Sequence, residues 1–256
     1  MKLSDIVTLN PGQNDVELKG ITFSRTSPDG EEGFPGTLDI KSTYLISECD
    51  KLMFFWEVEF AKGQGDIRTP LSMTNHALWN ISGDFKETIR HHDLKLNCDK
   101  WLPADSISMP TGEMIDVTGT PYDFRGGPNA PTLVNDMKRL DGACDGGGGS
   151  HGIDNNMAID RPAGSEGKLV EVVDLSCKGS GNRMIISTTQ NALELYTGNF
   201  LQFFGLEQYG AFALETTNFF SAANNIGKPG WSPEEQTMLI NGSKYHHATM
   251  HDFRKL

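Results

Sequence analysis

Several short stretches of this chain alternate between apolar and polar residues, which is typical of β-strands with one buried face. In residues 51–61 every second position is apolar, namely Leu52, Phe54, Trp56, Val58 and Phe60. Glu57 and Glu59 fall on the opposite face. Residues 37–46 alternate in the same way, and we expect them to pair with 51–61 through the polar SECD turn. The pattern predicts a half-buried antiparallel hairpin.

Other short strands are expected along the rest of the chain, several of them separated by turn signals rich in glycine and proline. The candidates are residues 69–79, 92–98, 114–118, 168–176, 182–188, 192–197, 210–216 and 245–253. One helical spacing occurs, formed by Leu133, Val134, Met137 and Leu140. Many strands and few helices favour an all-β fold, a large antiparallel β-sandwich in a single domain over residues 1–256.

The stretch GACDGGGGSHG, residues 142–152, is the one low-complexity segment. A glycine-rich loop binds phosphate when it joins a strand to a helix, often with a Gly-Lys-Ser/Thr sequence. No helical pattern follows here and that sequence is absent. We therefore expect a flexible surface loop.

The chain is acidic, with 34 Asp and Glu against 22 Lys and Arg, a formal net charge of -12. This balance argues against nucleic acid and against an anionic membrane surface, because both would repel it. No stretch reaches the roughly 18 apolar residues of a membrane span, and the N-terminus has no apolar signal region. The four cysteines are widely spaced and form no C-x-x-C pair. We expect a reduced, cytoplasmic protein.

The heptapeptide TNHALWN, residues 74–80, holds the first candidate for chemistry. His76 is either a structural hydrogen-bonding residue or a proton donor that faces a ligand. Asn75 and Asn80 supply polar groups that would order a site, and Trp79 offers a flat ring of the kind found in sites for polar small molecules.

Two acidic residues are the next candidates. Glu215 ends the stretch GAFALE, in which Phe212 and Leu214 share one face and Glu215 follows two alanines on the other. It is either an exposed glutamate or a partly desolvated general base with a raised pKa. Asp154 follows the glycine-rich loop in HGIDNN, where we expect it either in a turn or on the rim of the loop as an acceptor for sugar hydroxyl groups.

Histidines also occur as His91-His92 and His246-His247, with His251 further on. Adjacent residues of a strand point to opposite faces, and His247 and His251 lie about 13 Å apart along a strand. We therefore expect no metal site. Ser-His-Asp hydrolysis is not favoured either, because no G-x-S-x-G sequence occurs.

Six blocks occur in an order that resembles the aldose 1-epimerases, the galactose mutarotases. They are GITFSRTSPDGEEGFPGTL (20–38), LSMTNHALWNISGD (71–84), WLPADSISMPTGEMIDVTGTPYDF (101–124), HGIDNNMAI (151–159), LELYTGNFL (193–201) and GAFALETTNF (210–219). The resemblance implies a large antiparallel β-sandwich with a sugar site in a cleft on one sheet. It also implies that His76 is the general acid, Glu215 the general base and Asp154 a ligand of sugar hydroxyls, with no cofactor. We therefore expect the side chains of His76 and Glu215 to face each other across a gap as wide as a pyranose ring.

The resemblance covers the chain from about residue 20, and residues 1–19 are divergent. Members of the family carry a longer N-terminal region that supplies an arginine and a second histidine to the substrate site. Residues 1–19 contain neither Arg nor His, so we expect a shortened form that lacks the usual first strands. The oligomeric state is not specified by the sequence.

The resemblance implies an isomerase that interconverts the anomers of free galactose or glucose. Two other functions stay open. One is a hexose-6-phosphate mutarotase of the same superfamily, which would need a basic cluster at the cleft. The other is a non-catalytic carbohydrate-binding relative with a reduced site.

Overall fold

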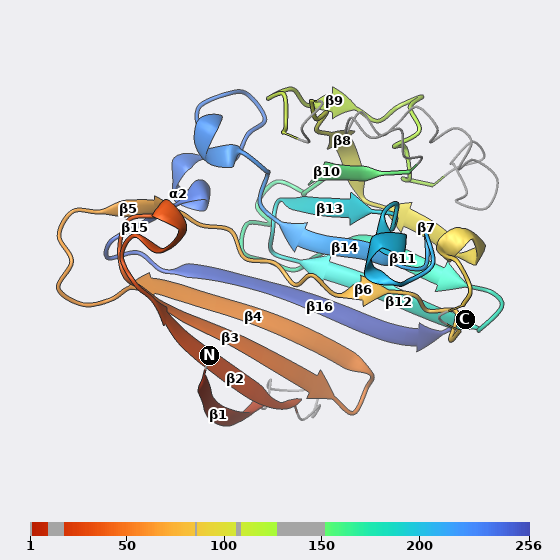
Figure 1. Cartoon of the computed structure of the whole chain (residues 1–256), viewed down its shortest axis with the longest axis horizontal. Helices are drawn as coiled ribbons and strands as arrows, with labels where there is room; N and C mark the ends of the chain where they lie inside the picture. The colour runs from red at the N-terminus through yellow and green to blue at the C-terminus, as the bar shows by residue number, and fades with distance from the viewer. Residues whose placement is uncertain (1, 10–17, 85, 106–108, 127–151) are drawn as a thin grey trace.

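The computed structural model describes residues 2–9, 18–84, 86–105, 109–126 and 152–256. Strands dominate these residues, and they form two large sheets and one small ribbon in which neighbouring strands pair antiparallel (Figure 1). The expected all-β sandwich is therefore confirmed. The helical pattern at 133–140 and residues 142–151 of the glycine-rich loop lie outside the described residues.

The larger sheet has eight strands in the order β1-β2-β3-β4-β16-β12-β11-β7. Their bounds are β1 Lys2–Leu9, β2 Leu18–Ser27, β3 Leu38–Ser47, β4 Lys51–Phe60, β16 Tyr245–Lys255, β12 Asn182–Thr188, β11 Val170–Cys177 and β7 Asp93–Leu96. The four N-terminal strands form a meander, and the C-terminal strand β16 joins this meander to β12. The C-terminal segment is thus built into the middle of the sheet.

The smaller sheet has six strands in the order β6-β14-β13-β10-β8-β9. Their bounds are β6 Leu78–Trp79, β14 Phe212–Thr217, β13 Ala192–Tyr196, β10 Asp154–Ile159, β8 Cys98–Trp101 and β9 Ile115–Asp116. A two-stranded ribbon pairs β15 (Met238–Ile240) with β5 (Arg68–Pro70). The helical elements are η1 Glu31–Gly33, η2 Ile89–His91, η4 Leu201–Phe204, η5 Ala222–Asn224 and α2 Glu234–Thr237. Within the described ranges, none of the helices has the length and apolar character needed to cross a membrane.

The main core lies between the smaller sheet and the β7, β11 and β12 part of the larger one. Its fully buried members include Leu175, Met184, Ile186, Met157, Leu193 and Phe212. Burying a side chain of this size contributes about 1.5–3 kcal/mol, so this layer supplies much of the stability. The β2–β4 part of the larger sheet extends beyond the smaller sheet, as Figure 1 shows, and a second cluster covers one of its faces.

The expected hairpin of residues 37–46 and 51–61 is confirmed as β3 and β4, with Ile40 opposite Val58. Phe54, Trp56, Val58 and Phe60 are buried, whereas Glu57 and Glu59 are exposed. Alternation therefore identified both the strand and its buried face.

Residues 69–79 do not form the single strand that we expected. β5 ends at Pro70 and β6 begins at Leu78. Between them, side chains replace the ladder: Tyr245 Oη accepts from Met73 N at 2.9 Å, and Asn75 Oδ1 accepts from Ala77 N at 3.1 Å. A backbone whose donors bond to side chains has no need of a neighbouring strand.

Candidate functional site

One face of the smaller sheet carries a row of polar side chains. Asn156 on β10 is paired with Glu194 on β13, and Glu194 is paired with Glu215 on β14. Leu193 and Leu195, which flank Glu194, and Leu214, which precedes Glu215, belong to the main core. Side chains alternate between faces along a strand, so the polar row points away from the core.

Asp154 is the first residue of β10 and lies two residues before Asn156, on the same face. We expected it on a loop, and this expectation was wrong. The polar sequence that surrounds Asp154 reads as a turn, but Asp154 and Asn155 pair with Tyr196 and Leu195 of β13. The ladder with β13 therefore fixes the direction of the Asp154 side chain.

Two of the sequence blocks meet at the start of β10. Thr197 Oγ1 accepts from Ile153 N at 2.8 Å, and Asn199 Nδ2 donates to Ile153 O at 3.1 Å. Gly152 adopts a φ of 128°, and a Cβ there would lie 2.1 Å from Asn199 Oδ1. Residue 152 must therefore be glycine, because Asn199 approaches its backbone closely. These contacts fix the backbone that leads into Asp154.

His76 lies in the irregular segment between β5 and β6 and approaches the polar row from outside the sheet. Its Nε2 is 3.4 Å from Glu215 Oε1. Asn80 Nδ2 donates to Gly210 O at 2.8 Å, which ties this segment to the residues just before β14. The structure therefore brings the expected acid and the expected base together.

The two members of this pair differ in solvent exposure. The His76 side chain is 70% exposed and the Glu215 side chain only 10%. We expected a gap as wide as a pyranose ring between them, but the side chains are in direct contact. A sugar ring would enter between them only if His76 rotates outward, and the exposed side chain leaves room for that rotation.

The carboxyl groups of the site have raised pKa values. Burial is the largest cause for Glu215; the proximity of His76 lowers its pKa and that of Asp154 raises it. Partial burial also raises the pKa of Asp154, although solvent still reaches part of the residue. The hydrogen bond with Glu194 and the proximity of His76 lower the pKa of Asp154. Loss of water disfavours the charged form of a carboxyl group, and nearby negative charges do the same. Glu215 is thus a stronger base than an exposed glutamate.

Glu194 is a site residue that the sequence interpretation did not single out. It is 6% exposed and sits between Asp154 and Glu215 on the same face. Burial and the charge of Asp154 raise its pKa well above the usual value. The signal was available in the sequence, since Leu193 and Leu195 mark one face of the strand and leave the other to a lone glutamate.

Trp79 and Asn75 make their contacts outside the polar row. The Trp79 ring stacks on His251 with 4.9 Å between centroids and packs against the main core. Asn75 is half-buried, and its Oδ1 closes a turn with Ala77 N. A role of either residue in sugar binding stays a prediction, and the contacts seen here are structural.

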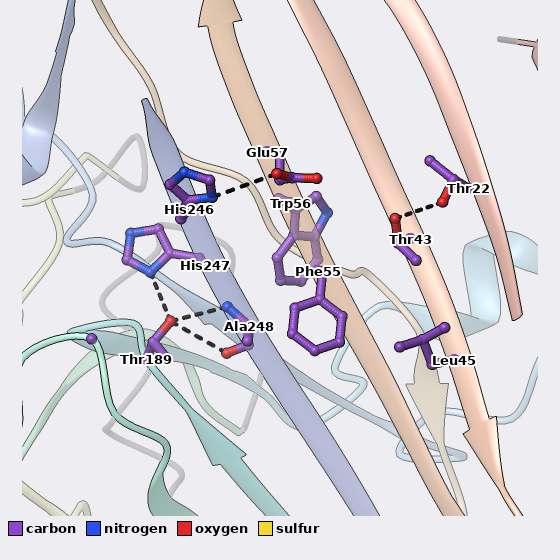
Figure 2. Close-up of a pocket in the computed structure, with 11 residues that line it drawn as sticks. Thr22, Thr43, Leu45, Phe55, Trp56, Glu57, Thr189, His246, His247 and Ala248 are labelled. Atoms are coloured by element: carbon purple, nitrogen blue, oxygen red, sulfur yellow. Dashed lines mark hydrogen bonds and ion pairs between the residues drawn. The ribbon is translucent and has the colours of Figure 1, made fainter. Parts of the chain in front are cut away.

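A separate hollow of about 470 Å³ lies in the larger sheet and is lined chiefly by β2, β3, β4 and β16 (Figure 2). Its polar groups are largely paired with one another. Thr22 bonds to Thr43 at 2.9 Å, Glu57 Oε1 lies 3.8 Å from His246 Nδ1, and Thr189 bonds to His247 at 3.0 Å. None of the residues of the polar row lines it.

In the described part of the chain, no group of three or more His, Cys, Asp or Glu residues is arranged to hold a metal ion. Together with His76, the polar row offers the expected base, the expected acid and further hydrogen-bonding groups, which is a set suited to moving protons on a hydroxylated ligand.

The comparisons with known proteins agree on one family. The family model described as aldose 1-epimerase matches residues 11–250. Galactose mutarotase from Sus scrofa is 32% identical over 241 residues, which is 91% of this chain and 63% of that protein. Galactose mutarotase from Homo sapiens is 31% identical over 245 residues, 93% of this chain and 64% of that protein. The chain thus spans just under two thirds of the length of these two relatives.

Solved structures show the same fold. An aldose epimerase homologue from C. elegans superposes with a TM-score of 0.71 at 22% identity, covering 95% of this chain and 69% of that one. Galactose 1-epimerase from Lactobacillus acidophilus gives a TM-score of 0.69 at 20% identity, covering 98% and 66%. With the family match over residues 11–250, we conclude that this chain belongs to the aldose 1-epimerase family.

Proposed function

We propose that this protein is an isomerase that interconverts the α and β anomers of a free aldohexose, such as galactose or glucose. The observation that carries the proposal is the contact of His76 Nε2 with Glu215 Oε1 at 3.4 Å. It unites a solvent-accessible proton donor with a desolvated carboxylate beside the hydrogen-bonding groups of Asp154 and Glu194. The names of the relatives, galactose mutarotase and aldose 1-epimerase, support the same reaction.

The reaction needs an acid and a base that act together. Glu215, as the carboxylate, takes the proton of the anomeric hydroxyl while protonated His76 donates a proton to the ring oxygen. The C1–O5 bond breaks, and the electron pair of the former O–H bond forms the aldehyde. Rotation about C1–C2 presents the other face of the carbonyl, and ring closure returns both protons in reversed roles. Each positioned acid or base typically contributes about 10²–10⁴-fold.

Asp154 is proposed to orient the sugar. It lies on the face of Glu215, and its carboxylate accepts hydrogen bonds from sugar hydroxyls without forming a covalent bond. The arrangement suits a neutral sugar better than a sugar phosphate. Asp154, Glu194 and Glu215 are carboxyl groups of one site, and the charge of -12 on the chain adds to the repulsion of a phosphate.

Polarimetry tests the proposal directly. Freshly dissolved α-D-glucose and α-D-galactose are followed as the optical rotation relaxes, with and without the full chain. We expect relaxation faster than in buffer, and we expect Glu215→Gln to remove the acceleration. Circular dichroism confirms that each sample is folded. A folded protein that accelerates neither sugar would leave the carbohydrate-binding alternative, and a larger effect on glucose 6-phosphate would favour the sugar-phosphate alternative.

A further inference from the structure

Two buried polar atoms in the polar row have no hydrogen-bond partner among the described residues. They are Glu194 Oε2 and Asn156 Nδ2. Glu194 and Asn156 are direct cross-strand partners on β13 and β10 and are 6% and 3% exposed. Buried polar groups are nearly always paired, so two such atoms on neighbouring strands indicate a functional arrangement.

The charges that face Glu194 are negative. Asp154 on β10 and Glu215 on β14 both act on it. Among the described residues, the basic side chain that contacts the row is His76, from the segment before β6, and it lies against Glu215 rather than Glu194. The loop that follows β14 contributes an uncharged contact, the bond from Phe220 N to Asn156 Oδ1 at 3.3 Å. No counter-charge therefore balances a carboxylate at Glu194 in the described part of the site.

Three carboxyl groups cannot all ionise at close range without a large electrostatic cost, and the most buried one is the most costly to charge. Glu194 is 6% exposed, whereas solvent reaches Asp154. The proton therefore belongs to Glu194. A neutral carboxyl group has a hydroxyl donor as well as an acceptor oxygen, so it can donate to Asp154 and accept from Asn156 Nδ2.

We propose that Glu194 is a positioning residue that stays protonated in the working enzyme and whose neutral carboxyl group orients Asp154 while Glu215 remains the charged base. The proposal rests on the proposed function for its effect on the reaction, but the protonation state of Glu194 is a property of the fold. The carboxyl group of Glu194 makes no bond with the reacting atoms. Because Glu194 is protonated, it donates a hydrogen bond to the carboxylate of Asp154. An ionised Glu194 would instead repel that carboxylate and displace it.

Infrared spectroscopy of the full chain tests the protonation state without reference to catalysis. A protonated carboxyl group has a C=O stretch that is separate from the bands of a carboxylate. At neutral pH we expect this band in the wild type and in Glu215→Gln, and we expect Glu194→Gln to remove it. Glu171→Gln on β11 is a matched control, because Glu171 is an exposed strand glutamate and its replacement leaves the band in place. Spectra of wild type and Glu194→Gln that do not differ in this band would overturn the proposal.

Kinetics test the positioning role. Glutamine keeps a donor and an acceptor without charge, whereas alanine removes both. Asp154 then loses the donor that the proposal gives it, and Asn156 keeps only the bond from Phe220 N. We expect Glu194→Ala to lower kcat/KM by about tenfold or more, mainly through KM, and Glu194→Gln to recover most of that loss. An ionised Glu194 predicts a different pattern. Glu194→Gln would then lower kcat/KM as much as Glu194→Ala does, and in both variants the acid limb of the pH profile would move to lower pH, because Glu215 has lost a negative neighbour.

The two proposals fail in different ways. If the wild type shows no mutarotation but the Glu194 band is present, the function is wrong and the protonated carboxyl group stands. If the wild type is active and the band is absent, the function stands and the role of Glu194 is wrong. Circular dichroism of Glu194→Ala separates loss of the fold from loss of positioning.

Discussion

His76 Nε2 and Glu215 Oε1 lie 3.4 Å apart, although one belongs to an irregular segment near the first third of the chain and the other to the strand β14. The carboxylate is fixed by its place in the sheet and the imidazole is held by a segment whose donors bond to side chains. The proposed base is therefore rigidly placed, and the proposed acid has room to move when a ligand arrives.

Removal of either member of this pair should abolish most of the activity. We expect His76→Ala and Glu215→Gln each to lower kcat by about 10²–10⁴-fold, because each supplies one proton transfer of a coupled step. Polarimetry on galactose measures the effect. His91→Ala is the matched control, since the His91 side chain is 65% exposed and also lies beside a glutamate, Glu87. Equal losses in His76→Ala and His91→Ala would contradict the assignment.

The pH profile should report the environment of Glu215. Its raised pKa means that it binds a proton at a higher pH than an ordinary glutamate, so activity should begin to fall on the acid side at a higher pH than an ordinary glutamate would produce. Asp154 contributes to that shift as a negative neighbour. Asp154→Asn should therefore move the acid limb of kcat/KM to lower pH and raise KM through the lost contact with sugar hydroxyls. A limb that moves to higher pH in Asp154→Asn would show that Asp154 does not act on Glu215 as a charge.

The entry into β10 should tolerate no side chain at residue 152. In Gly152→Ala the new Cβ would meet Asn199 Oδ1 at 2.1 Å and the backbone would keep a φ of 128°. We expect a loss of about 2–4 kcal/mol in the free energy of unfolding, from strain and overpacking together. Urea unfolding measures it. Gly164→Ala separates the two causes, because Gly164 has a φ of 75° with nothing within 4 Å, and we expect it to cost only about 1–2 kcal/mol.

The sequence predicted the parts of the fold that depend on neighbouring residues. Alternation identified the buried face of β4, and the apolar Phe212 and Leu214 placed Glu215 on the other face of β14. It failed where side chains replaced the ladder, as in residues 71–77, because the hydroxyl of Tyr245 comes from a distant strand. It also missed β10, whose polar start reads as a turn.

The site was predictable only in part for a related reason. The resemblance to a known family identified three candidate residues, His76, Asp154 and Glu215. Their roles stay proposals. Glu194 was overlooked because a glutamate in a strand is usually solvated, and its burial depends on the loops that cover the face. The order of strands across the smaller sheet, which sets Glu194 between Asp154 and Glu215, follows from long-range pairing that no local pattern encodes.

His251 is buried where the two hydrophobic clusters meet, between Trp79, which packs against the main core, and Phe54 of the second cluster. It is 2% exposed, and neither ring nitrogen has a hydrogen-bond partner in the described part of the chain. Its ring lies 4.9 Å from Trp79 and 5.2 Å from Phe54, centroid to centroid. Burial lowers the pKa of His251 to about 4. The folded protein therefore holds this imidazole neutral where the unfolded chain would protonate it.

The sign of the resulting pH dependence follows from proton counts. Below the unfolded pKa of about 6.5 the unfolded chain binds more protons, so the stability conferred by a neutral His251 is complete above that pH and is lost as the pH falls towards 4. The loss amounts to at most roughly 3 kcal/mol. His92 and His247 have lowered pKa values and act in the same direction, so the comparison must be made between variants.

Urea unfolding at pH 7.5 and pH 5 measures the difference. His251→Phe should reduce the loss of stability between these two pH values, because phenylalanine fills a similar volume and takes up no proton. His246→Gln is the control: its side chain is 56% exposed, and we expect it to leave the pH dependence as it is. If His251→Phe lost as much stability between pH 7.5 and pH 5 as the wild type does, the acid sensitivity would belong to other groups. The stacking of Trp79 on a neutral imidazole would then have no part in it.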